Sequence, residues 1–192
     1  MMMRIFFGLL FSGLLLSFGA MASNINVNMT ANLVSTSCRI SFDNNGNLDL
    51  GTVDFDYLNN NTSVDKVYSG GQSFYITVSD CAQVAGKNPS RLTVSFTPLA
   101  GTLAATNLQV FANQFAQGAK NVGVVILSTQ SAQNIFNVLD TRGLPQSIYP
   151  VTPDELANAT YHFYARMQKI DPTQAATSGI VKASVFVGVY YE

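Results

Sequence analysis

Alternation of apolar and polar residues is strongest at the C-terminal end of the chain, in SGIVKASVFVGVYYE (178–192). Every second residue there is apolar, at Val181, Ala183, Val185, Val187, Val189 and Tyr191. A period of two is typical of a strand with one buried face. Because chain ends usually fray, we expect another segment or another molecule to hold this strand.

Similar short runs recur along the chain, separated by turn-forming residues. They cover residues 24–29, 32–42, 47–55, 73–81, 91–98, 121–128 and 161–167. Glycine, asparagine and proline mark the gaps, at 44–46, 70–71, 87–89, 142–143 and 171–172. Many short strands with such turns predict one all-β sandwich domain. One segment differs: in residues 107–117, Leu108, Phe111 and Phe115 have helical spacing, which is compatible with a short helix.

The N-terminal segment has the pattern of an export signal. Arg4 precedes the apolar run 5–18, and Ala20-Met21-Ala22 is a cleavage motif of the A-x-A kind. The run is shorter than the stretch of about 20 residues that spans a bilayer, which argues against an uncleaved membrane anchor. We therefore predict that residues 1–22 are a signal peptide and that the mature chain begins at Ser23.

Charged residues are scarce, at 11% of the chain, whereas 47% of residues are hydrophobic. Removal of Arg4 with the signal peptide leaves nine basic residues against eleven acidic ones. No cluster of Lys or Arg is present, so binding to nucleic acid or to an anionic membrane has no electrostatic basis. A chain with so little charge is expected to cover apolar surface with a partner.

The two cysteines, Cys38 and Cys81, are an even number in an exported chain. In an oxidising compartment this predicts one structural disulfide. A free catalytic or metal-binding thiol is the alternative.

Candidate metal ligands and catalytic histidines are few. The single histidine, His162, lies in a strand pattern on the face opposite Phe163, which predicts a surface residue and not a Ser-His-Asp or Cys-His site. DNNGNLD (43–49) has oxygen ligands at alternate positions, as calcium loops do. Its glycine is at the fourth position instead of the sixth, and Asp54 stands where a bidentate glutamate is needed. A polar hairpin turn is the better interpretation.

Acidic pairs elsewhere do not form a credible acid–base site. Asp54 and Asp56 lie two residues apart in a segment predicted to be extended. Asp154 and Glu155 follow a proline, as at the start of a helix or turn. Phosphate-binding glycine motifs are also missing from the sequence. We expect no enzymatic activity, no metal and no cofactor.

Four segments are informative together, through their order and spacing. NLVSTSC (32–38) leads into the first cysteine, and the alternating run 74–81 ends on the second. KNVGVVI (120–126) is a strand-like run that contains Val-Gly and follows the loop in the middle of the chain. The C-terminal pattern has Gly179 fourteenth from the end, an alternating strand and an aromatic residue, Tyr191, at the penultimate position. With FYAR (163–166), this combination resembles the pilin family, the subunits of chaperone–usher fimbriae of Gram-negative bacteria, of the type 1 kind.

The resemblance implies an incomplete immunoglobulin-like sandwich that lacks its seventh strand, completed by donor-strand exchange. In this family a periplasmic chaperone lends a strand to the open groove, and an outer-membrane usher replaces it with the N-terminal extension of the next subunit. The groove and the chaperone-binding strand would include Gly179, Val185, Val187, Val189, Tyr191 and Glu192. The resemblance also implies that the chaperone grips the terminal carboxylate of Glu192.

The donor strand would lie in an N-terminal extension, residues 23–30, ahead of a pilin domain over residues 31–192. Its apolar face would carry Ile25, Val27 and Met29, with Ala31 next in register. The extension departs from the family pattern because it is short and lacks the glycine often found within a donor strand. The alternative for this segment is an ordinary first strand of the same domain.

These expectations describe a non-catalytic structural subunit of an adhesive fimbria on the cell surface, exported through the periplasm. Its expected partners are the chaperone, the usher and neighbouring fimbrial subunits, without nucleic acid and without membrane insertion. The alternative is a secreted, complete β-sandwich binding module or enzyme unrelated to pili.

Overall fold

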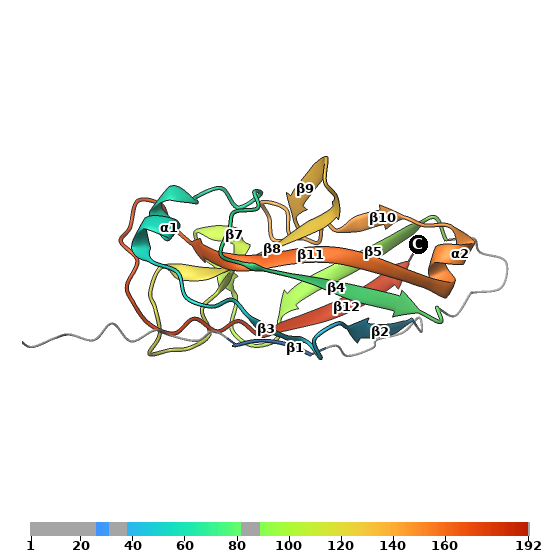
Figure 1. Cartoon of the computed structure of the whole chain (residues 1–192), viewed down its shortest axis with the longest axis horizontal. Helices are drawn as coiled ribbons and strands as arrows, with labels where there is room; N and C mark the ends of the chain where they lie inside the picture. Colours follow the sequence, from blue (N-terminus) through green and yellow to red (C-terminus); the bar gives the residue numbers. More distant parts are fainter. Residues whose placement is uncertain (1–25, 31–37, 82–88, 192) are drawn as a thin grey trace, which may run out of the picture.

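The structure, a computed structural model, describes residues 26–30, 38–81 and 89–191, and it is almost entirely built from strands (Figure 1). The first strands are β1 (Asn26–Thr30), β2 (Arg39–Phe42), β3 (Asn47–Asp49), β4 (Gln72–Ser79), β5 (Arg91–Pro98) and β6 (Leu103–Ala104). They are followed by β7 (Asn107–Ala112), β8 (Val122–Ser131), β9 (Asn134–Asn137), β10 (Ile148–Pro150), β11 (Asn158–Lys169) and β12 (Val185–Tyr191). Two short helices, α1 (Phe55–Asn60) and α2 (Pro153–Ala157), lie at opposite ends of the long axis. Neither helix, nor any other described segment, is a long apolar helix of the kind that could cross a membrane.

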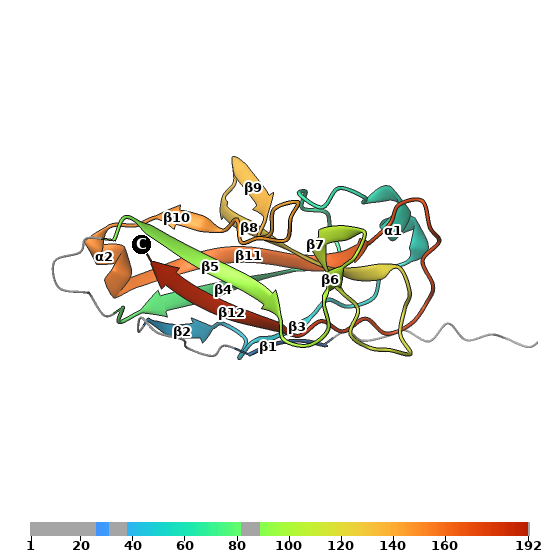
Figure 2. The same ribbon diagram turned by 180° about the vertical axis from the view of Figure 1, so that it is seen from behind.

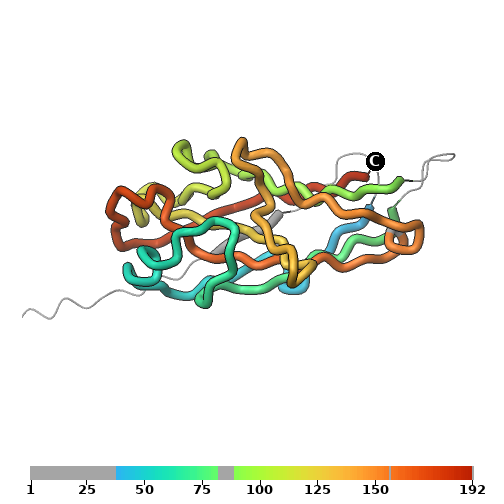
Figure 3. The backbone as a smooth tube through the Cα atoms, turned by 90° about the horizontal axis from the view of Figure 1, so that it is seen from above, coloured from blue at the N-terminus to red at the C-terminus, as the bar shows by residue number. Residues whose placement is uncertain are grey.

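The strands form two sheets that face each other. One sheet has the order β10-β5-β12-β1-β3, and the other has the order β2-β4-β11-β8-β7-β6, with β9 paired to β8. β4 and β11 lie in front in Figure 1, whereas β5 and β12 lie in front in the reverse view of Figure 2. Seen from above, β5 and β12 run along one side and β2 and β4 along the other (Figure 3). The expected all-β sandwich is therefore confirmed.

The hydrophobic core lies between the two sheets and follows the alternation read in the sequence. Phe96 of β5 and Phe163 of β11 meet across the gap, with ring centroids 5.0 Å apart. Residues at alternate positions of β4, β5, β11 and β12 are buried in the same core, including Ile76, Val78, Val94, Ala165, Val185 and Val187. His162 is exposed on the outer face of β11, opposite the buried Phe163, as predicted.

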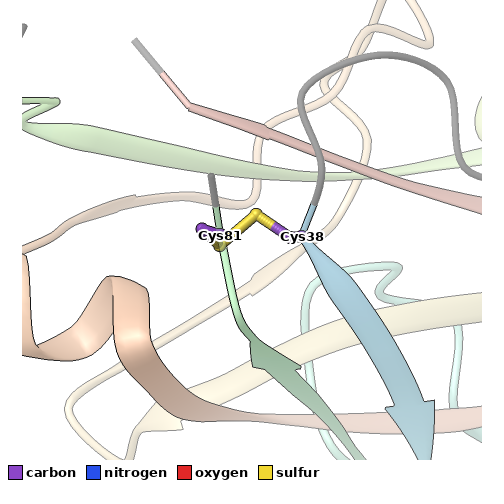
Figure 4. Close-up of a disulfide and its surroundings, with 2 residues drawn as sticks. All are labelled: Cys38 and Cys81. Atoms are coloured by element: carbon purple, nitrogen blue, oxygen red, sulfur yellow. A yellow bond between two sulfur atoms is a disulfide. The ribbon is translucent and has the colours of Figure 1, made fainter. Parts of the chain in front are cut away.

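The disulfide lies at one edge of the second sheet. Cys38 directly precedes β2 and Cys81 follows β4, and the structure joins the two sulfur atoms (Figure 4). β2 and β4 pair antiparallel, so the bond links two chain segments that already run side by side. The disulfide prediction is confirmed.

The helical interpretation of residues 107–117 is wrong. Residues 107–112 form β7, which pairs with both β6 and β8. Val110 and Phe111 are fully buried, whereas Leu108 is 38% exposed, so the three apolar residues with helical spacing do not share one buried face. Pairing with two neighbouring strands overrides a local pattern of this length.

The helices occur elsewhere, and one of them corrects a second expectation. Asp54 and Asp56 do not lie in an extended segment: Asp54 is the N-cap of α1, where its Oδ1 accepts a hydrogen bond of 2.7 Å from the amide of Tyr57. Asp56 lies in the first turn of α1, where a negative charge is favourable. Asp154 and Glu155 begin α2, in agreement with the sequence.

Candidate functional site

One edge of the last strand, β12, is fully paired. β12 runs antiparallel to β5 from the Val185–Pro98 pair to the Tyr191–Leu92 pair. Val185 and Val187 have no exposed surface, and Val189 and Tyr191 are half-buried. The alternation predicted for the C-terminal segment therefore describes a strand whose apolar face is part of the core.

The other edge of β12 is next to β1. The two strands run parallel, with Met29 opposite Val185 and Thr30 opposite Phe186. On its far side β1 runs antiparallel to β3, with Val27 opposite Leu48. β1 therefore joins β12 to β3, and without it the described sheet would end at β12 (Figures 1 and 2).

The residues expected to form the donor strand and the acceptor edge are only partly covered by the described segments. Val27 and Met29 belong to β1, whereas Ile25, Ala31 and Glu192 lie outside the described residues. The signal peptide at residues 1–22 also lies outside them. β1 pairs with two strands of its own chain, as an ordinary first strand would.

Gly179 lies where the chain crosses from the second sheet to the first, ahead of β12. Its φ is +146°, and a Cβ added to it would lie 2.5 Å from the amide nitrogen of Ala119. A Cβ on Gly118 would lie 2.0 Å from the carbonyl oxygen of Ile180. The two glycines thus let residues 118–119 and 179–180 approach backbone to backbone.

The segment between Gly179 and β12 is held by two side-chain amides that the sequence analysis did not identify. Asn113 Nδ2 donates to the carbonyl oxygen of Ile180 at 2.8 Å, and Asn113 Oδ1 accepts from the amide of Lys182 at 2.9 Å. Gln114 Nε2 donates to the carbonyl oxygen of Ser184 at 3.0 Å, and Gln114 Oε1 accepts from the amide of Ser184 at 2.7 Å. The sequence feature that could have pointed to them is the adjacent pair of side-chain amides directly after the apolar residues 110–112. The helical interpretation of this segment drew attention away from that pair.

The described residues contain no evident catalytic or metal-binding cluster. No group of three or more His, Cys, Asp or Glu side chains converges there. His162 lies 6.1 Å from Tyr75, between ring centroids, beside a shallow surface pocket that Asp43 and Thr129 also line. Nothing in this arrangement pairs the histidine with a nucleophile.

Two comparisons of the sequence with known proteins agree with each other. The model of the family described as Fimbrial protein matches residues 25–192. The chain is 43% identical over 168 residues to YadK, an uncharacterized fimbrial-like protein of Escherichia coli strain K12, covering 87% of this chain and 85% of YadK. A crystal structure of the CupB6 tip adhesin from Pseudomonas aeruginosa overlaps 88% of the chain, with 14% identity and a TM-score of 0.46. The chain spans only 41% of that adhesin.

Proposed function

This chain belongs to the family of fimbrial proteins, and we propose that it is a structural subunit of an adhesive surface fimbria that polymerises by donor-strand exchange. The observation that carries the proposal is the position between β12 and β3, which one five-residue strand near the N-terminus occupies. A neighbouring subunit that inserted its own N-terminal strand there would join two molecules without any change in the rest of the sandwich.

The pairing of β1 favours replacement by another strand. Among the described residues, β1 and β12 share two residue pairs, and the two strands run parallel. By contrast, β12 pairs with β5 antiparallel along its whole length. Parallel pairing is slightly less stable per residue than antiparallel pairing. A donor that ran antiparallel to β12 and reached Val187 and Val189 would therefore gain more from β12 than the two described parallel pairs of β1 do.

The composition of the two strands suits an apolar joint. Ile25, Val27, Met29 and Ala31 alternate with polar residues on the proposed donor. On the acceptor side, the apolar face of β12 carries Val185, Val187, Val189 and Tyr191. Burial of each large apolar side chain is worth roughly 1.5–3 kcal/mol, so a few such contacts suffice for a stable link.

An unfilled edge of this kind would aggregate, which is why the proposal includes assembly partners. A periplasmic chaperone holds the edge of β12, with the terminal carboxylate of Glu192 as an anchor, and an outer-membrane usher exchanges the chaperone for the next subunit. The low charge of the chain fits a protein that is rarely free of a partner. The product is a non-enzymatic fibre on the cell surface that supports adhesion.

The test supplies the donor covalently. A second copy of residues 23–33 is fused after Glu192 through a flexible turn of a few residues, so that the added strand can return antiparallel to β12. We expect the fused chain to be a soluble monomer that needs no chaperone and does not polymerise. The unfused chain should require the chaperone and should form polymers.

One observation favours a competing function, because β1 completes the sheet from its own chain. If the unfused chain is as stable a monomer as the fused one and never polymerises, β1 is an ordinary first strand. The protein is then a complete β-sandwich binding module, and the joint proposed above does not exist.

A further inference from the structure

We propose that the side chains of Asn113 and Gln114 act as a clamp that holds residues 180–184 extended and so presents the edge of β12 for strand exchange. The proposal rests on the proposed function, because it assigns positioning residues to the acceptor edge. Neither Asn113 nor Gln114 is among the described residues that pair with β1. Their effect on the edge would pass through residues 180–184.

Residues 180–184 have the character of a strand without a strand partner. Val181 and Ala183 are buried and Lys182 is exposed, so their side chains alternate as those of β12 do. The ladder of β12 nevertheless begins only at Val185. Backbone groups outside a ladder need other partners. Here the backbone amides of Ala119 and Leu99 donate to the carbonyl oxygens of Ile180 and Ser184, and two side chains provide further bonds.

A primary amide has the same donor and acceptor groups as a peptide unit, which lets the clamp imitate a neighbouring strand. Asn113 bonds to the carbonyl oxygen of Ile180 and the amide of Lys182, and Gln114 bonds to both backbone groups of Ser184. The backbone amide of Gln114 adds a bond of 2.8 Å to the carbonyl oxygen of Lys182. Ile180, Lys182 and Ser184, which alternate with the buried Val181 and Ala183, are thus each bonded to Asn113, to Gln114 or to both.

The clamp is itself anchored on two sides. Asn113 Nδ2 also donates to the carbonyl oxygen of Ala119 at 2.9 Å, and its Oδ1 accepts from the amide of Phe115 at 3.0 Å. Gln114 Nε2 also donates to the carbonyl oxygen of Ala100 at 2.7 Å, in the turn that follows β5. The side chains are therefore held by partners outside residues 180–184 as well.

The link to strand exchange is one of position. The last clamped residue, Ser184, directly precedes Val185 and Phe186, the two residues of β12 that pair with β1. When the edge is empty, no strand on that side orders the start of β12. The clamp would then supply the order that an incoming strand needs, which lowers the entropic cost of binding.

The test replaces each amide by the carboxylate of the same shape, in Asn113→Asp and Gln114→Glu. Each change turns the donating nitrogen into an oxygen that faces two carbonyl oxygens. Gln114→Ala is the uncharged second variant, and Gln117→Glu is the matched control because Gln117 is exposed in the same turn. A synthetic peptide of residues 23–33 is added to the chaperone-bound chain, and its rate of insertion is measured. Hydrogen exchange of the Lys182 and Ser184 amides and urea unfolding of the fused chain are measured in parallel.

We expect insertion to be roughly tenfold slower in each clamp variant, as the loss of partly buried hydrogen bonds implies, with faster exchange at Lys182 and Ser184. Gln117→Glu should match the wild type, and the fused variants should still unfold cooperatively. If the two amides lose protection and insertion keeps its wild-type rate, the residues are only structural and the clamp proposal fails. If the wild-type chain itself accepts no peptide, the proposed function fails instead.

Discussion

Met29 of β1 lies opposite Val185 of β12, in a pairing whose two strands run parallel. The same edge of β12 is the place where a strand from another subunit would insert. Occupation by the chain's own strand and occupation by a donor are therefore mutually exclusive. Changes on β1 should separate polymerisation from chaperone capture, whereas changes on β12 should affect both.

Replacement of Val27 by Asp should block polymerisation and spare chaperone capture. The carboxylate would enter an apolar joint, which costs several kcal/mol unless it is neutralised. In the proposed function, capture uses the acceptor edge and not the extension, so the chaperone complex should form normally. Asn28→Asp is the control, since it adds the same charge at the alternate position of the strand. Polymer ladders of normal length from Val27→Asp would show that the extension is not the joint.

Replacement of Val187 by Asp should abolish both capture and polymerisation. Val187 has no exposed surface and contributes to the core face of β12. Tyr191→Ala should weaken capture, and the released subunit should be degraded or should aggregate. Tyr190→Asp, at a position that is 40% exposed, serves as the control. Co-purification with the chaperone measures the effect, and full capture of Val187→Asp would contradict the proposed acceptor edge.

Loss of the disulfide should lower the yield of the protein in the periplasm. Cys38 and Cys81 are 43 residues apart in sequence, and a loop of that length corresponds to about 4 kcal/mol in the chain-entropy model. Cys38→Ala and the double variant with Cys81→Ala should be equally affected, because each removes the same single bond. Detection of two free thiols in the unfolded, unreduced mature chain would disprove the bond.

Stability should fall at high pH because of two buried tyrosines. Burial raises the pKa of Tyr149 to about 12, and burial also raises the pKa of Tyr161 to about 12, with a smaller effect from Glu155. In the unfolded chain both phenols ionise near pH 10. The folded chain keeps these protons longer, so the stabilisation is complete below pH 10 and is lost as the pH rises through about 12.

The Tyr149→Phe variant tests this pH dependence. Its urea midpoint should fall less steeply between pH 10 and 12 than that of the wild type. At neutral pH it should be less stable, because the buried hydroxyl of Ser128 loses its partner 2.7 Å away. Adding Ser128→Ala should recover part of that loss. An unchanged slope in Tyr149→Phe would mean that Tyr149 does not cause the effect.

Replacement of Arg166 by Met should destabilise the end of the sandwich that carries α1. Arg166 is fully buried on β11. Its Nε donates to the carbonyl oxygen of Lys66 at 3.1 Å, and its Nη2 donates to that of Ser63 at 2.5 Å. Methionine would leave these partly buried acceptors without the guanidinium, at a cost of about 2 kcal/mol.

Urea unfolding of the fused chain measures the Arg166 effect. Arg166→Lys should give an intermediate loss, because an ammonium group keeps the charge but not the planar fork of donors. Arg142→Met is the control, since Arg142 bonds Asp140 at the surface and should tolerate the change. Wild-type stability of Arg166→Met would show that the side chain contributes by packing alone.

The sequence by itself determined the strands whose faces differ in burial. In β4, β5 and β12 apolar residues alternate with polar ones, and the structure buries the apolar set. β11 follows this pattern only up to Phe163, because beyond it the polar Arg166 and Gln168 are buried as well. Period-two burial is a local property, since successive side chains of a strand point to opposite faces. The disulfide followed from the number of cysteines and from the export signal. The polar turn at 44–46 followed from residue types that tolerate positive φ, as Asn45 and Gly46 have.

Only the tertiary structure decided where these strands pair and what holds them. Residues 107–112 became β7 because two neighbouring strands were available to pair with them. The position of β1 between β12 and β3 depends on partners about 20 and 156 residues away, as the Val27–Leu48 and Met29–Val185 pairs illustrate. Asn113 reaches Ile180 across 67 residues of sequence, and Gln114 reaches Ser184 across 70. Bonds of that range leave no local pattern in a sequence, because the fold alone brings their donors and acceptors together.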